Sequence, residues 1–198
     1  MKKIGLLLFG IIVILIVLVA LKSSEKIHPP GILVNEIPQQ NNLSQRKTWI
    51  RNGFFYKALA EFSLTARVLG KKEYYTGTES IISQYDLALG WGQMSDSKIL
   101  DDIEITQEFR FYFWKTDQFP IPREDIEKKS ANMHIIAANE NIEEVLDEIV
   151  VGDIIKYSGY LVEVRGPENF NWKSSLTRSD TGNGACEIVW VENIVILF

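Results

Sequence analysis

The chain has 198 residues, with 21 Lys and Arg against 26 Asp and Glu, a formal charge of −5 and a pI near 5.2. This length predicts one domain, with or without an appendage. The acidic balance argues against a nucleic-acid-binding protein, because phosphate binding needs a basic surface. A single cysteine excludes an internal disulfide, and two histidines exclude a metal site built on three His ligands.

An uninterrupted apolar run, Ile4–Leu21, follows Met1-Lys2-Lys3. Its 18 residues form a helix of about 27 Å, which is enough to cross a thin hydrocarbon core. A cleaved signal peptide is the alternative, but Leu18 and Ala20 make a poor small-x-small cleavage site. We therefore expect residues 1–22 to be an uncleaved transmembrane anchor. The N-terminus is then cytoplasmic, and the following domain is periplasmic or extracellular.

Residues 23–46 contain three prolines and the run Gln39-Gln40-Asn41-Asn42, which is typical of a flexible tether. The first 26 residues hold four lysines and one glutamate, which leaves 17 basic and 25 acidic residues and a formal −8 for residues 27–198. A domain this acidic gains nothing from an anionic lipid surface, so we expect it to stand off the bilayer.

Residues 47–198 are expected to form a single globular domain outside the cytoplasm. In chain order, the hydrophobic pattern predicts a short helix in 49–59, a strand at 62–69 and a turn at 70–72. A helical turn at 95–100, a strand at 103–115 and helices at 122–129 and from Asn141 to about 149 follow, and then strands at 154–164, 172–176 and 185–197. The fold class is therefore α+β, mostly antiparallel β with short helices. Glycine-punctuated strands in the C-terminal half favour a small barrel there.

Three stretches mix small, polar and aromatic residues in ways that neither helix nor strand periodicity requires. They are residues 86–92 (DLALGWG), 130–136 (SANMHII) and 174–187 (SSLTRSDTGNGACE). They resemble blocks of a bacterial family of membrane-anchored proteins, over roughly residues 60–198. The resemblance implies a membrane-anchored protein but no activity and no catalytic residue.

His134 is the only imidazole of residues 47–198, and Cys186 is the only thiol. A His-assisted mechanism must therefore use His134 as base, with Cys186, Ser174 or Ser175 as nucleophile. Asp180, Asp86 or Asn132 are the candidates for orienting the base. Against an enzyme, Cys186 shares strand parity with the apolar residues Ile188 and Trp190, as a buried structural cysteine would.

Ligand-binding candidates are Arg110, Arg178, Asp86, Trp91 and Asn132. Arg110 is predicted either to pair with a buried acid such as Asp86 or to form a pocket wall. Arg178 either pins the polar loop 177–184 through Asp180 or faces an anionic ligand. The aromatic run around Tyr112 and Trp114 can cover a core strand or form a protein-binding patch.

These observations predict a single-pass membrane protein, held in the bilayer by residues 4–21. Its outer domain is a non-catalytic binding or envelope-assembly module. The expected partner is an envelope protein or a small ligand, with no nucleic acid, metal or cofactor. The alternative is an envelope hydrolase that uses His134 with Cys186 or with Ser174 or Ser175.

Overall fold

The computed structural model describes residues 25–177 and 186–198. The predicted anchor, residues 1–22, lies outside this part, as do Arg178 and Asp180. Among the described helices, none is both long and apolar enough to cross a bilayer. The described fold is α+β with mostly antiparallel strands and a few short helices, as the sequence predicts.

The strands alternate with short helices along the chain. In order, the elements are β1 (Gln39–Asn41), β2 (Thr48–Arg51), β3 (Phe54–Glu73), α2 (Thr78–Ile82), β4 (Tyr85–Gly90), the 3-10 turn η1 (Gly92–Ser95), α3 (Ser97–Leu100), β5 (Glu104–Glu108), β6 (Phe111–Lys115), α4 (Arg123–Lys128), β7 (Ser130–Ala137), α5 (Glu140–Glu148), β8 (Ile154–Arg165), β9 (Asn171–Lys173) and β10 (Glu187–Ile196).

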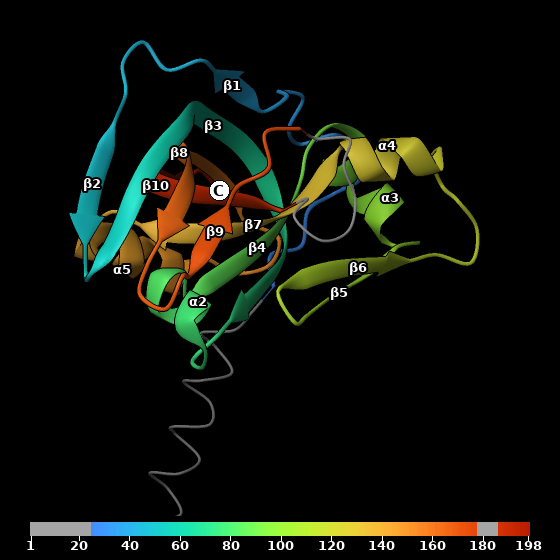
Figure 1. Ribbon diagram of the computed structural model, residues 1–198. Coiled ribbons are helices and arrows are strands. Elements are labelled where there is room, and N and C mark those ends of the chain that lie inside the picture. Colours follow the sequence, from blue (N-terminus) through green and yellow to red (C-terminus); the bar gives the residue numbers. More distant parts are fainter. Residues whose placement is uncertain (1–24, 178–185) are drawn as a thin grey trace, which may run out of the picture.

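Five strands follow one another in a closed ring of pairings, which we call the barrel. The main sheet runs β3-β4-β7-β10-β8, and a further pairing of β8 with β3 joins its ends. All neighbours are antiparallel except β7 and β10, which are parallel. Figure 1 shows the long, bent β3 curving around the other strands. The ring takes strands from residues 54 to 196, so the barrel is not confined to the C-terminal half.

The interior of the barrel is the main hydrophobic core. Alternate residues of each strand point inward, among them Leu87 on β4, Met133 and Ile135 on β7 and Val189 on β10, all at most 1% exposed. Helix α5 packs on this core through Ile142 and Leu146. Its N-cap is Asn139, whose Oδ1 accepts from the Ile142 amide, two residues earlier than the sequence predicts.

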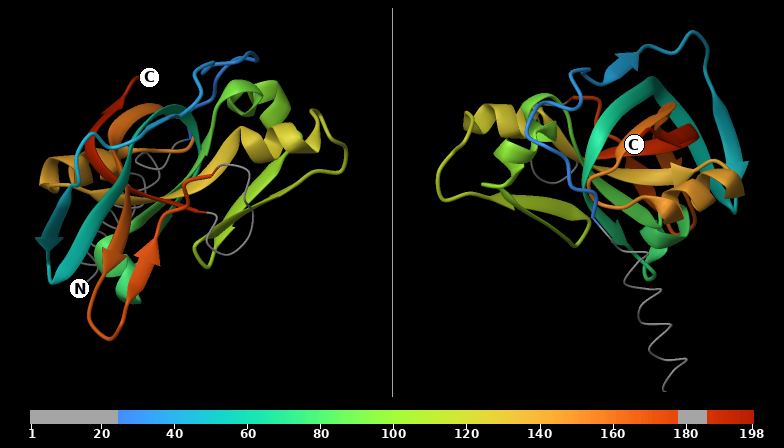
Figure 2. Two further views of the ribbon diagram at one scale, coloured as in Figure 1. Left: turned by 45° about the horizontal axis from the view of Figure 1, so that its top comes forward. Right: turned by 180° about the vertical axis from the view of Figure 1, so that it is seen from behind.

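A second unit, which we call the lobe, is inserted between β4 and β7. It contains η1, α3, the β5–β6 hairpin and α4, and it lies beside the barrel in every view (Figures 1 and 2). Its own small core consists of Met94, Ile103, Ile121 and Ile126. Because the lobe covers the outer face of β4 and β7, residues on both faces of these strands are buried.

The described part of the expected tether, residues 25–46, is packed on the domain. Val34 is 3% exposed in the main core, and its amide donates to Ser95 Oγ over 3.0 Å. Lys26 Nζ lies 2.6 Å from Asp153, and His28 Nε2 is 2.7 Å from the Gly152 carbonyl. Apolar side chains and paired backbone groups therefore hold parts of this segment against the domain.

Three local predictions are also wrong. Residues 49–59 belong to β2 and β3 rather than to a helix. Strand β3 continues to Glu73 through a bulge between Val68 and Gly70, where a turn was expected. The alternating run 103–115 is a hairpin rather than one strand, because Phe109 and Arg110 adopt left-handed φ angles of 51° and 69°.

Gly159 allows two strands to approach at the barrel seam. The irregularity lies in β10, between Val191 and Asn193, while Gly159 pairs opposite Val191. A Cβ at Gly159 would lie 1.9 Å from the Trp190 carbonyl oxygen. The bulge therefore lies opposite Gly159, in β10, and not in β8, the strand that carries the glycine.

Candidate functional site

Asp86 and His134 face each other on the outer surface of the barrel. They are register partners in the β4–β7 ladder, and their neighbours Leu87 and Met133 point into the core. His134 Nδ1 lies 2.8 Å from Asp86 Oδ1, so the ring N–H can donate to the carboxylate. Both residues are at most 3% exposed. The pairing register thus produces a buried acid–imidazole contact.

Arg110 reaches the same carboxylate from the turn of the β5–β6 hairpin. Its Nη1 donates to Asp86 Oδ1 over 2.7 Å, and its guanidinium lies 3.8 Å from the ring centre of Tyr74. The Arg110 amide donates to Tyr74 Oη over 3.0 Å. The predicted pairing of Arg110 with Asp86 is confirmed. Arg110 lies in a turn, however, and not on a strand.

Asn132 links the lobe to the barrel at this point. Its Nδ2 donates to the Arg110 carbonyl over 3.1 Å, and its Oδ1 accepts from Gln107 Nε2 over 2.8 Å. Gln107 Nε2 also lies 3.2 Å from the Asp86 carbonyl. The amide of Asn132 is therefore oriented from both sides, as in a preorganised polar network.

Cys186 and Trp172 complete the surroundings of this network. The half-buried Cys186 places its Sγ 3.9 Å from the Arg110 carbonyl oxygen. The Trp172 ring, from β9, lies 4.7 Å from the ring of His134. Four buried side-chain atoms of the described residues have no hydrogen-bond partner, and two of them, Asp86 Oδ2 and Arg110 Nη2, belong to this network. Buried polar atoms are normally hydrogen-bonded, so these two atoms can pair with a further polar group.

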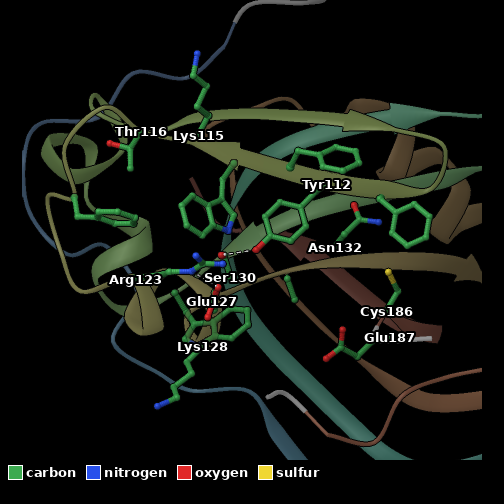
Figure 3. Close-up of a pocket in the computed structure, with 16 residues that line it drawn as sticks. Tyr112, Lys115, Thr116, Arg123, Glu127, Lys128, Ser130, Asn132, Cys186 and Glu187 are labelled. Atoms are coloured by element: carbon green, nitrogen blue, oxygen red, sulfur yellow. Dashed lines mark hydrogen bonds and ion pairs between the residues drawn. The ribbon is translucent and has the colours of Figure 1, made fainter. Parts of the chain in front are cut away.

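A cavity of about 590 Å³ opens beside the network, between the lobe and the barrel. Its walls include six aromatic residues, Trp91, Phe111, Tyr112, Phe113, Trp114 and Phe119. Asn132, Cys186 and Glu187 lie together at one end, and Arg123, Glu127 and Lys128 from α4 lie at the other (Figure 3).

Tyr112 forms part of the cavity wall. Its Oη is 2.9 Å from Ser130 Oγ, a contact drawn in Figure 3. Burial raises the pKa of the Tyr112 phenol above its ordinary value. Tyr112 is therefore a neutral hydrogen-bonding group at physiological pH.

The structure brings together five of the residues that the sequence singled out. They are His134, Asp86, Arg110, Asn132 and Cys186, joined by the contacts above. Trp91 is buried and lines the cavity at the foot of the lobe. Ser174 and Ser175 are bound locally: Ser174 Oγ accepts from the Ile188 amide over 3.0 Å, and Ser175 Oγ is 3.0 Å from the Thr177 carbonyl.

Sequence reasoning missed Tyr74, Gln107 and Trp172. Each lies in a segment whose local pattern predicts only a strand or the residues after it. A buried arginine needs an aromatic surface to stack on and backbone carbonyls that accept its hydrogen bonds. For Arg110, this requirement was the one sequence signal that such neighbours exist.

Comparison of the chain with models of protein families, with curated proteins and with solved structures found no match. In the described ranges, no group of three or more His, Cys, Asp and Glu side chains is arranged to hold a metal ion.

Proposed function

We propose that this protein is a membrane-anchored binding module whose ligand occupies the cavity between lobe and barrel. The observation that carries the proposal is an aromatic-walled space of about 590 Å³ that ends on a fixed amide, Asn132. Small-molecule sites typically combine apolar walls with a few oriented polar groups in a volume of about 300–1,000 Å³.

The walls and the polar end define the ligand class. Flat apolar faces such as Phe111, Phe113 and Trp114 favour a ring-shaped group that can stack. Glu187, which is 5% exposed, lies at the Asn132 end and favours a hydrogen-bond donor. We therefore infer a small ring-containing ligand with hydroxyl or amino groups, for example a sugar unit of an envelope glycan.

The order of the strands supports a binding role. A five-stranded Greek-key barrel of this kind resembles an OB-fold, in which β4 and β7 would correspond to the second and third strands. In that fold the face of these strands binds oligosaccharides or oligonucleotides. The excess of acidic residues favours the former. Fold alone does not define function, so the cavity remains the main support.

Binding is tested by the thermal stability of the protein in the presence of mono- and disaccharides. A ligand that binds only the folded protein raises the melting temperature. We expect a rise for the wild type and a loss of that rise in Asn132→Ala and Phe113→Ala. Ile37→Ser, an exposed change outside the cavity, is the matched control. An equal rise in all four proteins would contradict the assignment.

The location of the domain forms part of the proposal. The apolar run 4–21 serves as the anchor, and the domain lies outside the cytoplasm. A C-terminal alkaline phosphatase fusion, active only after export, should be active. A C-terminal β-galactosidase fusion should be inactive, and the reverse result would overturn the orientation.

The second candidate is an envelope hydrolase with Cys186 as nucleophile and His134 as base. It is favoured by the 2.8 Å contact that orients the His134 ring against Asp86, with Cys186 on the same outer face of the adjoining strand. An activated thiolate should react with iodoacetamide well below the ordinary thiol pKa of about 8.5. His134→Ala should abolish that reactivity. A wild-type pH profile like that of a free thiol would exclude this candidate.

A further inference from the structure

We infer that one end of the domain is a bilayer-facing surface, which inserts aromatic and aliphatic side chains into the headgroup region. We call it the basal face. It consists of the chain start at Glu25–His28, the loop after β3, helix α2 and the β5–β6 turn. The inference rests on the proposed anchor but goes beyond it, since an anchor alone does not determine how the domain sits.

Contacts place these segments together. Glu25 and Ile27 line a second cavity with Lys72 on β3 and Gln107 on β5. At the end of β3, Tyr74 accepts a hydrogen bond from the Arg110 amide in the β5–β6 turn. Helix α2 follows this end of β3 and lies opposite β1 on the barrel (Figure 1), and the view from behind in Figure 2 agrees.

The chain leaves little distance between this face and the predicted span. The span ends at Leu21, and Lys26 is already fixed, because its amide donates to the Val151 carbonyl over 2.8 Å. Leu21 and Glu25, the first described residue, are four positions apart, so at most about 14 Å of extended chain separates them. The interfacial layer on each side of the hydrocarbon core is about 5–8 Å thick. The anchor therefore holds the basal face close to the interfacial layer, and the proposal is direct contact in place of the expected stand-off.

The basal face exposes large apolar side chains. Ile27 is 93% exposed, Phe109 82%, Tyr75 74% and Ile81 67%. Aromatic and aliphatic side chains with this exposure gain free energy in the interfacial region of a bilayer, where tyrosine is also enriched.

The turn that presents Phe109 is strained and firmly held. Both Phe109 and Arg110 have left-handed φ angles, which suit Asn or Gly and disfavour a bulky side chain. Arg110 is fixed by Asp86, Tyr74 and Asn132, whereas the Phe109 ring projects into solvent. The contacts of Arg110 hold the turn in this conformation, and the exposed Phe109 ring is left available for an external contact.

The charges of the basal face determine which lipid headgroups it can contact. Four acids, Glu25, Glu73, Glu79 and Glu108, accompany Lys26, Lys72 and Arg110. Lys26 is paired with Asp153 and Arg110 with Asp86, so the remaining charge of the face is mainly acidic. Such a face is not attracted to anionic headgroups, so insertion depends on apolar side chains. We infer a zwitterionic interface as the matching surface.

The test uses the full chain in phosphatidylcholine vesicles. In a Cys186→Ser background, a single cysteine at Phe109, Tyr75 or Ile81 carries an environment-sensitive fluorophore. Ile37→Cys is the matched control, since Ile37 is 68% exposed and precedes β1 at the opposite end. We expect blue-shifted emission and quenching by nitroxide-labelled lipids at the three basal positions and neither effect at residue 37. Adding phosphatidylserine should not deepen the insertion.

Three outcomes distinguish a failure of the basal face from a failure of the anchor. A chain that floats with the vesicles but shows no quenching at the basal positions overturns the basal face and leaves the anchor intact. Equal quenching at residue 37 overturns it as well, because it indicates no preferred orientation. A chain that does not float overturns the anchor and the basal face together.

Discussion

The two faces of strand β7 are equally buried and chemically opposite. Met133 and Ile135 point into the barrel core at 0% and 1% exposure, while Asn132 and His134 on the outer face are each 3% exposed. The inner face needs only apolar packing. The outer face is covered by the lobe and by Trp172 of β9, so each of its polar groups needs a partner from elsewhere in the chain. The buried residues on the inner side of β7 form the core, and those on the outer side form the candidate functional site.

The polar network on the outer face of β7 costs stability but holds its side chains in one geometry. A buried network centred on Asp86 is costly to assemble and is not the best way to stabilise a fold. It does fix Asn132, through Arg110 and Gln107, in one geometry at one end of the cavity. The contrast with the inner face yields four predictions.

The largest effect is expected for Asp86→Ala. Removing the carboxylate leaves Arg110 and His134 buried without their acceptor, and we expect a loss of about 3–5 kcal/mol of unfolding free energy. Urea unfolding measures it. In the control, Asp86→Ala combined with Arg110→Met should recover much of the loss. Identical losses in the single and double variants would show that the stranded charge is not the cause.

On the inner face, Leu87→Ala should cost about 2–5 kcal/mol by creating a cavity in the barrel core. Leu87 is fully buried. Unlike Asp86→Ala, this variant should keep the wild-type saccharide-dependent shift in melting temperature, because only the inner face changes. Loss of that shift in a folded Leu87→Ala protein would contradict the independence of the two faces.

The third prediction concerns stability at alkaline pH. Burial raises the pKa of Tyr112 at the cavity wall and, together with a hydrogen bond to Asp147, that of Tyr85 on β4. Above pH of about 10 the unfolded chain loses these protons while the folded state keeps them. The unfolding free energy should therefore fall with rising pH, by up to about 1.4 kcal/mol per pH unit for each group.

Tyr112→Phe and Tyr85→Phe should each reduce that alkaline slope, and neither should change the slope between pH 6 and about 9. Chemical unfolding at a series of pH values measures both. A slope that both variants leave unchanged above pH of about 10 would contradict the assignment to these phenols.

The smallest effect is expected for Phe109→Asn at the hairpin turn. Asn tolerates the left-handed conformation, so the variant should be more stable by about 1 kcal/mol or less. Thermal unfolding measures the gain. Phe109→Val, with a β-branched side chain at the same φ, should instead lose stability. A gain in both variants would show that backbone conformation is not the cause.

Periodicity predicted much of the fold because most elements are governed by local patterns. Helices α4 and α5 and strands β8 and β10 lie near their expected positions. Errors occur where tertiary structure overrides the local signal. The alternation of 103–115 continues through a turn that the contacts of Arg110 hold in place.

The sequence by itself determined which groups are present: one imidazole and one thiol in residues 47–198, an acidic balance and an apolar N-terminal run. It also identified Asp86, Arg110, Asn132, His134 and Cys186 as residues that simple patterning does not require. Only the tertiary structure decided that they meet. The β4–β7 register sets Asp86 opposite His134, and the lobe carries Arg110 onto the Asp86 carboxylate. Register and docking arise from contacts between distant segments, which local periodicity does not encode.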